Sequence, residues 1–353
     1  MPVRSFEPIN PAADVTTTRT FLHEVVPVTG SIISGTYSDN NIKNYTHGMF
    51  QSVYDYPYLS SSANHIFDLS MGYGATSAIS GATNVQGSKK INMYNQFAQT
   101  LLGFTGSAND IRVFESDLLL DQTGSMKEVF FVNFSRLLVK DEVKKNTFSL
   151  TIGTGSYSKP FHNGAGHQPA SLTLQDANAR INGDGINNAD GGDYGVLFSN
   201  SAGTGDGLGV VFYQAGIAVI SASAFQGITD FAKHPTHGNQ TTTQAFTGSS
   251  ITGSIEAFRR RVLNISLNNT TEINSTIYFC RAPSNKFNYS SNPTYVTGSK
   301  IRVKNVASDN PVSYVTTVGL YNSSNELLAV AKLSEPLKKS VDNELTVRVR
   351  LDY

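Results

Sequence analysis

The chain has 353 residues with 27 basic and 27 acidic side chains, so its formal net charge is zero. A neutral chain has no bulk field that would draw it to nucleic acid or to an anionic membrane, and we expect neither as a partner. Charged residues make up only 15% of the chain, and its polarity comes mainly from Ser, Thr, Asn and Gly.

These small polar residues favour turns and local backbone bonds over helix interiors, so the composition predicts β structure with long loops. A surface with few charges is poorly protected against association, which indicates a subunit that is packed by neighbours. No run of eighteen apolar residues occurs, so no membrane-spanning helix is predicted. Cys280 is the single cysteine, and we interpret it as a buried small hydrophobe rather than a reactive nucleophile.

The N-terminal part of the chain combines an arm, strands and a helix. Residues 1–24 are weakly patterned, and we expect an extended arm that becomes ordered against a partner. Residues 23–37 predict two short strands around a turn, and residues 64–74 predict another strand by their alternation. In the run "KKINMYNQFAQTLLGF" apolar residues recur at helical spacings before Gly103. This spacing predicts one amphipathic helix over 89–102.

Hairpins are predicted through the middle of the chain. Residues 128–153 read as two strands around the charged turn "KDEVKKN", and residues 194–221 read as two apolar strands around the loop "NSAGTGDG". Residues 257–282 carry two more strands joined by "NNTTEIN". The Gly/Asn/Asp-rich stretch 176–193 is predicted to be a loop insertion.

The C-terminal segment has the most regular pattern. Residues 312–320 alternate, "NSSN" forms a turn, and the alternation resumes from Leu327 until Pro336 interrupts it. The last strand places apolar and polar residues on opposite faces, and such an uncapped strand can pair with another chain. It either closes its own module or adds to a partner's sheet. The predicted interface residues are Leu345, Val347, Arg348, Val349, Arg350, Leu351 and Tyr353.

Together these patterns predict a mainly β fold. We expect antiparallel β-sandwich or barrel-like modules with one amphipathic helix and an extended N-terminal arm. The predicted organisation is an arm over 1–24, a β-rich core over 25–300 and a C-terminal antiparallel module over 301–353.

One loop resembles a calcium site. In "ARINGDGINNADGGDYG" the residues Asn182, Asp184, Asn188 and Asp190 follow the spacing of oxygen ligands in a calcium loop. The first ligand position, however, falls on Arg180, and Gly191 stands where a bidentate Glu is needed. We interpret the segment as a turn-rich loop, with Asn182, Asp184 and Asp190 as the metal candidates.

Other candidates for chemistry have simpler interpretations. The pairs His162/His167 and His234/His237 could ligate zinc or iron, but neither spacing lies on a helix and Pro235 breaks the second pair. The Gly-rich runs lack the helix and Lys that a phosphate site needs. The basic run 259–261 is interpreted as forming ion pairs to a partner. No catalytic group and no cofactor site is predicted.

Two stretches resemble known proteins. "STIYFCRAPSNKFNYSSNPTY" and the segment from Ser313 to Tyr353 resemble virion structural proteins of contractile-tailed bacteriophages, as do "NHIFDLSMGYG" and "KKINMYNQFAQTLLG". "VGLYNSSNELLAVAKL" is similar to sheet segments of phage tail-collar fibre proteins. The resemblance implies a tail or baseplate subunit without enzymatic activity, while a neck, collar or capsid-surface position stays open.

Three functional hypotheses follow from the sequence. The first is a structural virion subunit, assembled in the host cytoplasm, whose partners are other virion proteins and further copies of itself. The second is a receptor- or glycan-binding fibre protein, in which loops 176–209 make the contacts and Tyr194 and Tyr213 stack on sugar. The third, a glycan-degrading enzyme, is disfavoured because no carboxylate pair can be placed.

Overall fold

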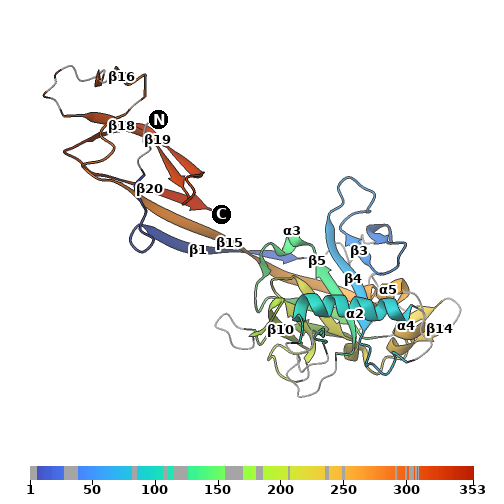
Figure 1. Ribbon diagram of the computed structural model, residues 1–353. Coiled ribbons are helices and arrows are strands. Elements are labelled where there is room, and N and C mark those ends of the chain that lie inside the picture. The colour runs from blue at the N-terminus through green and yellow to red at the C-terminus, as the bar shows by residue number, and fades with distance from the viewer. Residues whose placement is uncertain are drawn as a thin grey trace. The chain divides into compact units, whose positions relative to one another are not determined.

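The computed structural model describes most of the chain (Figure 1). The described residues are 6–27, 39–81, 86–105, 110–114, 126–155, 170–179, 186–205, 207–234, 238–248, 251–290, 292–298, 300–301, 306, 308 and 310–353. Of the two strands predicted over 23–37, residues 23–27 form the end of the strand Val15–Pro27, and residues 28–37 lie outside these ranges. Strands make up 47% of the chain and helices 15%, which confirms the mainly β antiparallel fold.

The chain divides into two compact units. The core unit comprises residues 22–271, and the strand unit comprises residues 1–21 together with 272–353. The chain crosses between the units within β1 (Val15–Pro27) and again within β15 (Val262–Ala282). The sequence had placed boundaries after residues 24 and 300 instead.

The core unit is built on one curved antiparallel sheet. Its strands follow the order β15-β7-β8-β10-β11-β12-β5-β4-β3-β2, with β6 on β15 and β9 on β10. Four strands separate β5 from β7 in this order. The ring centroids of Phe134 in β5 and Phe148, the residue before β7, nevertheless lie only 5.9 Å apart. The sheet therefore curls on itself. Its strands are β2 (Ile42–Asn44), β3 (Gln51–Tyr54), β4 (His65–Tyr73), β5 (Glu128–Phe134), β6 (Glu142–Val143), β7 (Ser149–Gly153), β8 (Ser171–Gln175), β9 (Ile186–Ala189), β10 (Gly192–Phe198), β11 (Gly207–Phe212) and β12 (Ile217–Ser221).

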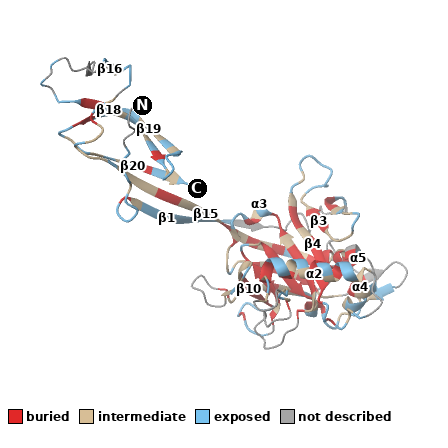
Figure 2. Cartoon of the chain, in the orientation of Figure 1, coloured by how far each residue is buried: buried red, intermediate tan, exposed pale blue. Residues whose placement is uncertain are grey.

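Both faces of the central strands are buried, as Figure 2 shows. In β5 the side chains of Phe130 and Val132 join one apolar cluster, while Val129 and Phe131 join the other. Such a strand reads as a continuous apolar run, which explains "EVFFVNF". All residues of both clusters lie in the core unit.

Helices cover the two faces of this sheet. On one face α2 (Gly87–Leu102) buries Tyr94, Ala98, Leu101 and Leu102, and it ends at Gly103 with a φ of 72°. On the other face Phe130 stacks on Phe258 at 4.5 Å between ring centroids. Phe258 belongs to α5. The remaining helices are α3 (Arg136–Val139), α4 (Thr242–Gly248) and α5 (Ile251–Arg259), with 3₁₀ turns η1 (Asp39–Asn41) and η2 (Ala222–Phe225).

The prediction of one helix is wrong, because three further helices lie among the described residues. The predicted helix over 89–102 is confirmed with its start at Gly87. The helix α5 contains Gly253 and β-branched residues that lower helix propensity, and burial of Ile251, Ile255 and Phe258 stabilises it instead. Within the described part of the chain, no helix has the length and apolarity to span a membrane.

The strand unit consists of long strands. Residues 15–21 of β1, residues 272–282 of β15 and all of β20 (Leu345–Asp352) belong to one sheet, with β15 between the other two. A hairpin of β18 (Val312–Tyr321) and β19 (Leu327–Ser340) forms a second sheet. The short pairs β16 (Val296–Thr297) with β17 (Lys300–Ile301), and in the core unit β13 (Ala232–His234) with β14 (Gly238–Gln240), complete the strands.

Three predictions about strands are wrong. The strands predicted over 128–153 do not form a hairpin, because β5 pairs with β4 and β12, while β7 pairs with β8 and β15. The residues 262–282 form a single strand, because the ladder with β6 pairs Asn269 with Val143, and the Asn269 side chain donates to the Leu138 carbonyl at 3.0 Å. The ladder overrides the turn preference of "NNTTEIN". Strand β19 continues past Pro336, because Thr317 pairs with Lys332 and Val315 with Leu337, which leaves the proline in a bulge.

Candidate functional site

The predicted interface residues lie in the strand unit on β20. Its antiparallel register with β15 runs from Ser275↔Asp352 to Ala282↔Leu345, and the backbone N–H and C=O of Tyr353 bond to Asn274. Residues 345–352 therefore close a sheet within their own chain. Among the described strands β20 pairs with β15 alone, so its other edge carries no strand.

The two faces of β20 alternate as the sequence predicted. Val349 is buried and Leu345, Val347 and Leu351 are half-buried, beside Tyr278 and Cys280 of β15. The opposite face exposes Arg348 and Arg350. Tyr353, which follows the last residue of β20, is 73% exposed. Burial raises the pKa of the Cys280 thiol, and nearby Asp14 raises it further, so the thiolate is disfavoured.

Polar contacts hold the base of the hairpin in place. The ammonium group of Lys339 is fully buried and donates to the Ser284 carbonyl at 3.3 Å, the Asn288 Oδ1 at 2.7 Å and the Ser340 carbonyl at 2.8 Å. The Ser313 hydroxyl donates to the Phe287 carbonyl. Sequence reasoning missed Lys339, since "PLKKS" has no feature that separates a buried lysine from an exposed one.

The strand unit has little apolar burial of its own. Neither apolar cluster includes any of its residues, and its buried apolar side chains among the described residues are Val312, Leu320 and Val349. By contrast it holds twelve of the eighteen large apolar side chains that the described chain exposes. So few buried apolar side chains contribute little to the stability of this unit.

The predicted calcium loop is partly described. Asn182 and Asp184 lie outside the described residues. Asp190 is exposed at the turn between β9 and β10, and the N–H of Gly191 donates to the Leu101 carbonyl at 2.9 Å. The Asn188 amide donates to Asp193 at 2.9 Å. The described part of this loop is a hairpin turn packed on the end of α2.

Metal ligands are not gathered elsewhere in the described chain. Across the ranges given above, no three His, Cys, Asp or Glu side chains lie close enough to hold a metal ion. The pair His162/His167 and the side chains of His234 and His237 lie outside the described part.

The expectation that Tyr194 and Tyr213 stack on sugar is wrong. Tyr194 is 6% exposed and Tyr213 is fully buried. The Tyr213 hydroxyl donates to Asp176 Oδ2 at 3.0 Å, and the N–H groups of Asn146 and Phe148 donate to the same carboxylate at 2.7 and 2.9 Å. Burial raises the pKa of Asp176 to about 6, although these three hydrogen bonds oppose the rise.

The basic run 259–261 is satisfied within the chain. Arg259 and Arg260 pair with Glu256, one turn earlier on α5. Arg261 is fully buried and donates to the backbone carbonyls of four residues. These are Phe231 at 2.9 Å, Gly153 at 3.0 Å, Gly155 at 2.9 Å and Asp230 at 2.7 Å. The interpretation of this run as ion pairs to a partner is therefore wrong.

A second buried cation lies at the start of α2. Lys90 is fully buried, its ammonium donates to the Phe246 carbonyl at 2.6 Å, and burial lowers its pKa to about 8. This contact joins α2 to α4. Lowered lysine pKa values occur at reactive sites, but here the group is enclosed and holds two helices together.

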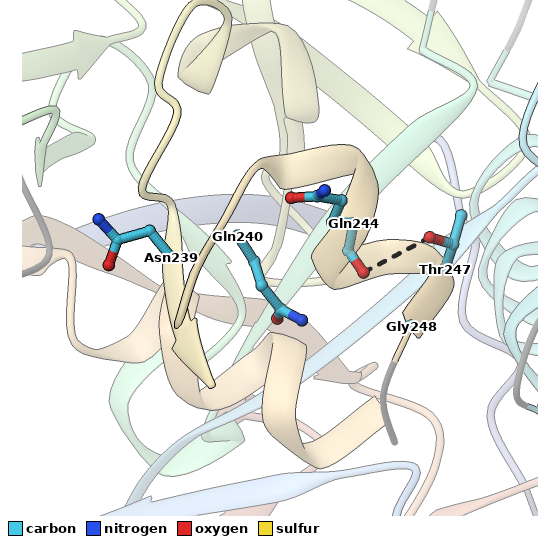
Figure 3. Close-up of a pocket in the computed structure, with 5 residues that line it drawn as sticks. All are labelled: Asn239, Gln240, Gln244, Thr247 and Gly248. Carbon is cyan, nitrogen blue, oxygen red and sulfur yellow. Dashed lines mark hydrogen bonds between the residues drawn. The ribbon is translucent and has the colours of Figure 1, made fainter. Parts of the chain in front are cut away.

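A shallow pocket of about 290 Å³ lies between β14 and α4 (Figure 3). The side chains of Asn239 and Gln240 point in different directions from β14, and Thr247 donates to the Gln244 carbonyl. The described residues that line it are uncharged: Asn239, Gln240, Gln244, Thr247 and Gly248. These side chains offer hydrogen bonds but no acid or base.

Comparisons of the chain with protein-family models, with curated proteins and with solved structures give no match.

Proposed function

We propose that this chain is a non-enzymatic structural subunit of a bacteriophage virion, in the tail or baseplate region, which assembles through its strand unit. The observation that carries the proposal is the near absence of an apolar core in the strand unit, combined with its many exposed apolar side chains. Exposed apolar patches of this kind mark association sites.

The type of virion partner follows from the sequence resemblance. The stretches 275–295 and 313–353 resemble virion structural proteins of contractile-tailed phages, and both lie in the strand unit. The core unit supports this assignment in a different way, since its sheet is covered by helices on both faces. The core unit is packed as a rigid body, and we expect the strand unit to connect it to neighbouring subunits.

Immunogold labelling tests the proposal directly. Antibodies raised against the purified chain should decorate intact virions of the phage that encodes it, at one defined position. Deletion of residues 345–353 should abolish incorporation into particles, because it exposes the β15 edge and removes the apolar face of β20. Particles that form normally without the chain, or virions that show no label, contradict a structural role.

A second candidate function is binding of a neutral glycan, and the amide-lined pocket between β14 and α4 favours it. Amide groups both donate and accept hydrogen bonds, as sugar hydroxyls require. A glycan array with the full chain tests this function. Specific binding that is lost in Gln240→Ala supports it, and an array without signal contradicts it.

A further inference from the structure

The outer edge of β20 presents backbone groups to which no strand of the described chain bonds. Opposite residues of an antiparallel ladder alternate between pairs that exchange two hydrogen bonds and pairs that exchange none. Tyr353 and Asn274 exchange both bonds, at 2.9 and 3.0 Å between N and O. In the same phase, the N–H of Phe279 points away from β20 and donates to the Asp14 carbonyl at 2.8 Å. The backbone groups of alternate residues of β20 are therefore directed at the free edge: Thr346, Arg348, Arg350 and Asp352.

This edge lacks the features that ordinarily prevent strand pairing. β20 pairs with β15 over all eight of its residues without a bulge, and it contains no proline. Strand β19 of the hairpin, by contrast, contains Pro336 and shifts its register with β18. Bulges and prolines protect edge strands from pairing with other chains. The edge of β20 is therefore open to a further strand.

The opposite edge of the same sheet offers less to a partner. It is formed by β1, whose side chains over residues 16–21 are exposed on both faces. A strand added there would find no buried face to extend. β20 has such a face, since Val349 is buried and the apolar residues at alternate positions are half-buried. A strand added beside β20 therefore gains apolar burial when its own apolar residues alternate.

The other face of β20 selects a partner by charge. Arg348 is exposed and has no ion-pair partner among the described residues. Arg350 donates from Nε to Asp352 Oδ1 at 2.7 Å and from Nη2 to the Ser275 hydroxyl at 2.9 Å. Side chains that lie directly opposite each other in a sheet interact, so the added strand is favoured when it places an acidic side chain beside Arg348.

A second copy of β20 is a poor neighbour for this edge. In an antiparallel register centred on Val349, Arg348 of each copy lies opposite Arg350 of the other, so two pairs of like charges meet. Like charges directly opposite each other destabilise a sheet. The charge order therefore favours a different strand, which carries acidic residues on the face where β20 carries arginine.

We propose that β20 binds, by strand addition, an extended segment of another virion subunit in which acidic side chains alternate with apolar ones. This inference rests on the proposed structural function and names the chemistry of the partner. The outward backbone groups of β20 supply the hydrogen bonds, since only another extended backbone matches their spacing. Arg348 attracts the acidic side chains, and the apolar face of β20 continues into the added strand.

Fluorescence anisotropy with the full chain tests the chemistry of the partner. The probes are two labelled, end-blocked peptides as long as β20, one in which Glu alternates with Val and one in which Lys alternates with Val. The Glu/Val peptide should bind at least about ten-fold more tightly, and Arg348→Glu should reverse this preference. Lys332→Glu, at an exposed position of β19, makes the same change in net charge and should leave the preference unchanged.

A proline substitution tests the backbone hydrogen bonds. Thr346→Pro removes one outward N–H and leaves both arginines and the bonds to β15 in place, since proline is tolerated where the N–H of an edge strand faces solvent. The variant should bind the Glu/Val peptide about three- to ten-fold more weakly. Thr346→Val keeps the N–H and should bind like the wild type. Thermal unfolding should match the wild type in every variant, and Arg348→Glu gives an independent reading if Thr346→Pro does not fold.

The outcomes separate strand addition from the wider function. Equal binding of the two peptides, binding of neither, or binding that a folded Thr346→Pro leaves unchanged overturns the proposal. A wild-type dimer in sedimentation that is lost in Thr346→Pro also overturns it, because a second copy then occupies the edge. A chain that labels virions but binds neither peptide leaves the structural role standing. Preferential binding of the Glu/Val peptide by a chain that is absent from virions supports strand addition and contradicts the virion role.

Discussion

Gly72 lies near the end of β4, where helix α2 packs directly on the strand. A Cβ at this position would meet the Lys90 carbonyl at 2.7 Å and the Tyr94 nitrogen at 2.8 Å, both in the helix backbone. The close approach of helix and sheet therefore depends on a missing side chain. At the residue scale the core unit is held by such single positions, and by buried polar groups such as Asp176, Lys90 and Arg261.

Gly72→Ala should lower the free energy of unfolding by about 1–3 kcal/mol, since the added methyl group forces the helix away from the sheet. Gly81→Ala is the matched control, because nothing lies within 4 Å of a Cβ there. Urea titration of both variants measures the difference. Equal stability of the two variants would show that α2 does not pack this closely on β4.

Tyr213→Phe should cost about 1–3 kcal/mol at pH 7.5, because the Asp176 carboxylate loses a charge-assisted donor. The cost should shrink below pH 6, where Asp176 is protonated in the folded state and the bond loses its charge.

The raised pKa of Asp176 also makes the stability of the wild-type chain depend on pH. The folded state binds a proton more readily than the unfolded state between about pH 6 and 4, so this group adds stability as the pH falls through that range.

Chemical denaturation of the variant and the wild type at pH 7.5 and pH 5 measures this coupling. Tyr58→Phe is the control, since Tyr58 is 38% exposed. A cost for Tyr213→Phe that is the same at both pH values contradicts the role of Asp176.

At the scale of elements, long strands replace an apolar core in the strand unit. The hairpin β18–β19 pairs along most of its length, yet a two-stranded hairpin is only marginally stable by itself. Its base is held to the segment 284–288 by Lys339 and Ser313. Buried hydrogen bonds therefore stabilise the base of this hairpin, whereas apolar packing stabilises the core unit.

Lys339→Met should release the base of the hairpin. Three oxygen acceptors lose their donor, and a loss of about 1–3 kcal/mol in local stability is expected. Hydrogen exchange of the β18 and β19 amides should accelerate, while exchange in the core unit stays unchanged. Lys338→Met, at an exposed position beside it, serves as the control. Equal exchange in both variants would indicate that Lys339 does not anchor the hairpin.

At the scale of the whole molecule, the two units differ in how they reach stability. The core unit contains every residue of both apolar clusters, and the strand unit contains most of the exposed apolar side chains. Apolar packing therefore stabilises the core unit, while the strand unit has few buried apolar side chains among its described residues. This division agrees with the proposed role of the strand unit in assembly.

Residues 22–271 expressed alone should unfold cooperatively, at a midpoint close to that of the full chain, and should stay monomeric. The reason is that removal of the strand unit takes away no member of either apolar cluster. Calorimetry and sedimentation measure the two properties. A fragment that is unfolded would show that the core unit needs the strand unit, and a fragment that associates would place the interface elsewhere.

Local pattern was sufficient where one face of an element is buried and the other is wet. The helix α2 and the alternation along β20 were predicted from side-chain periodicity, because burial on one face leaves a period in the sequence. Strand β4 was also predicted from its alternation, although both of its faces are buried. The predicted interface over 345–353 stays a prediction, since its outer edge has no strand among those described.

Tertiary contacts decided which strands are continuous and which polar and aromatic side chains are buried, since side-chain periodicity does not encode either. The chain by itself determined a mainly β architecture, the hairpins β10–β11 and β18–β19, and its principal helix. Only the folded structure decided that β15 is continuous, that Tyr194 and Tyr213 are buried, that Arg261 and Lys339 are enclosed, and that the apolar core lies in one unit. The physical reason is that burial of a polar side chain, or rescue of a turn-forming run, depends on partners distant in sequence.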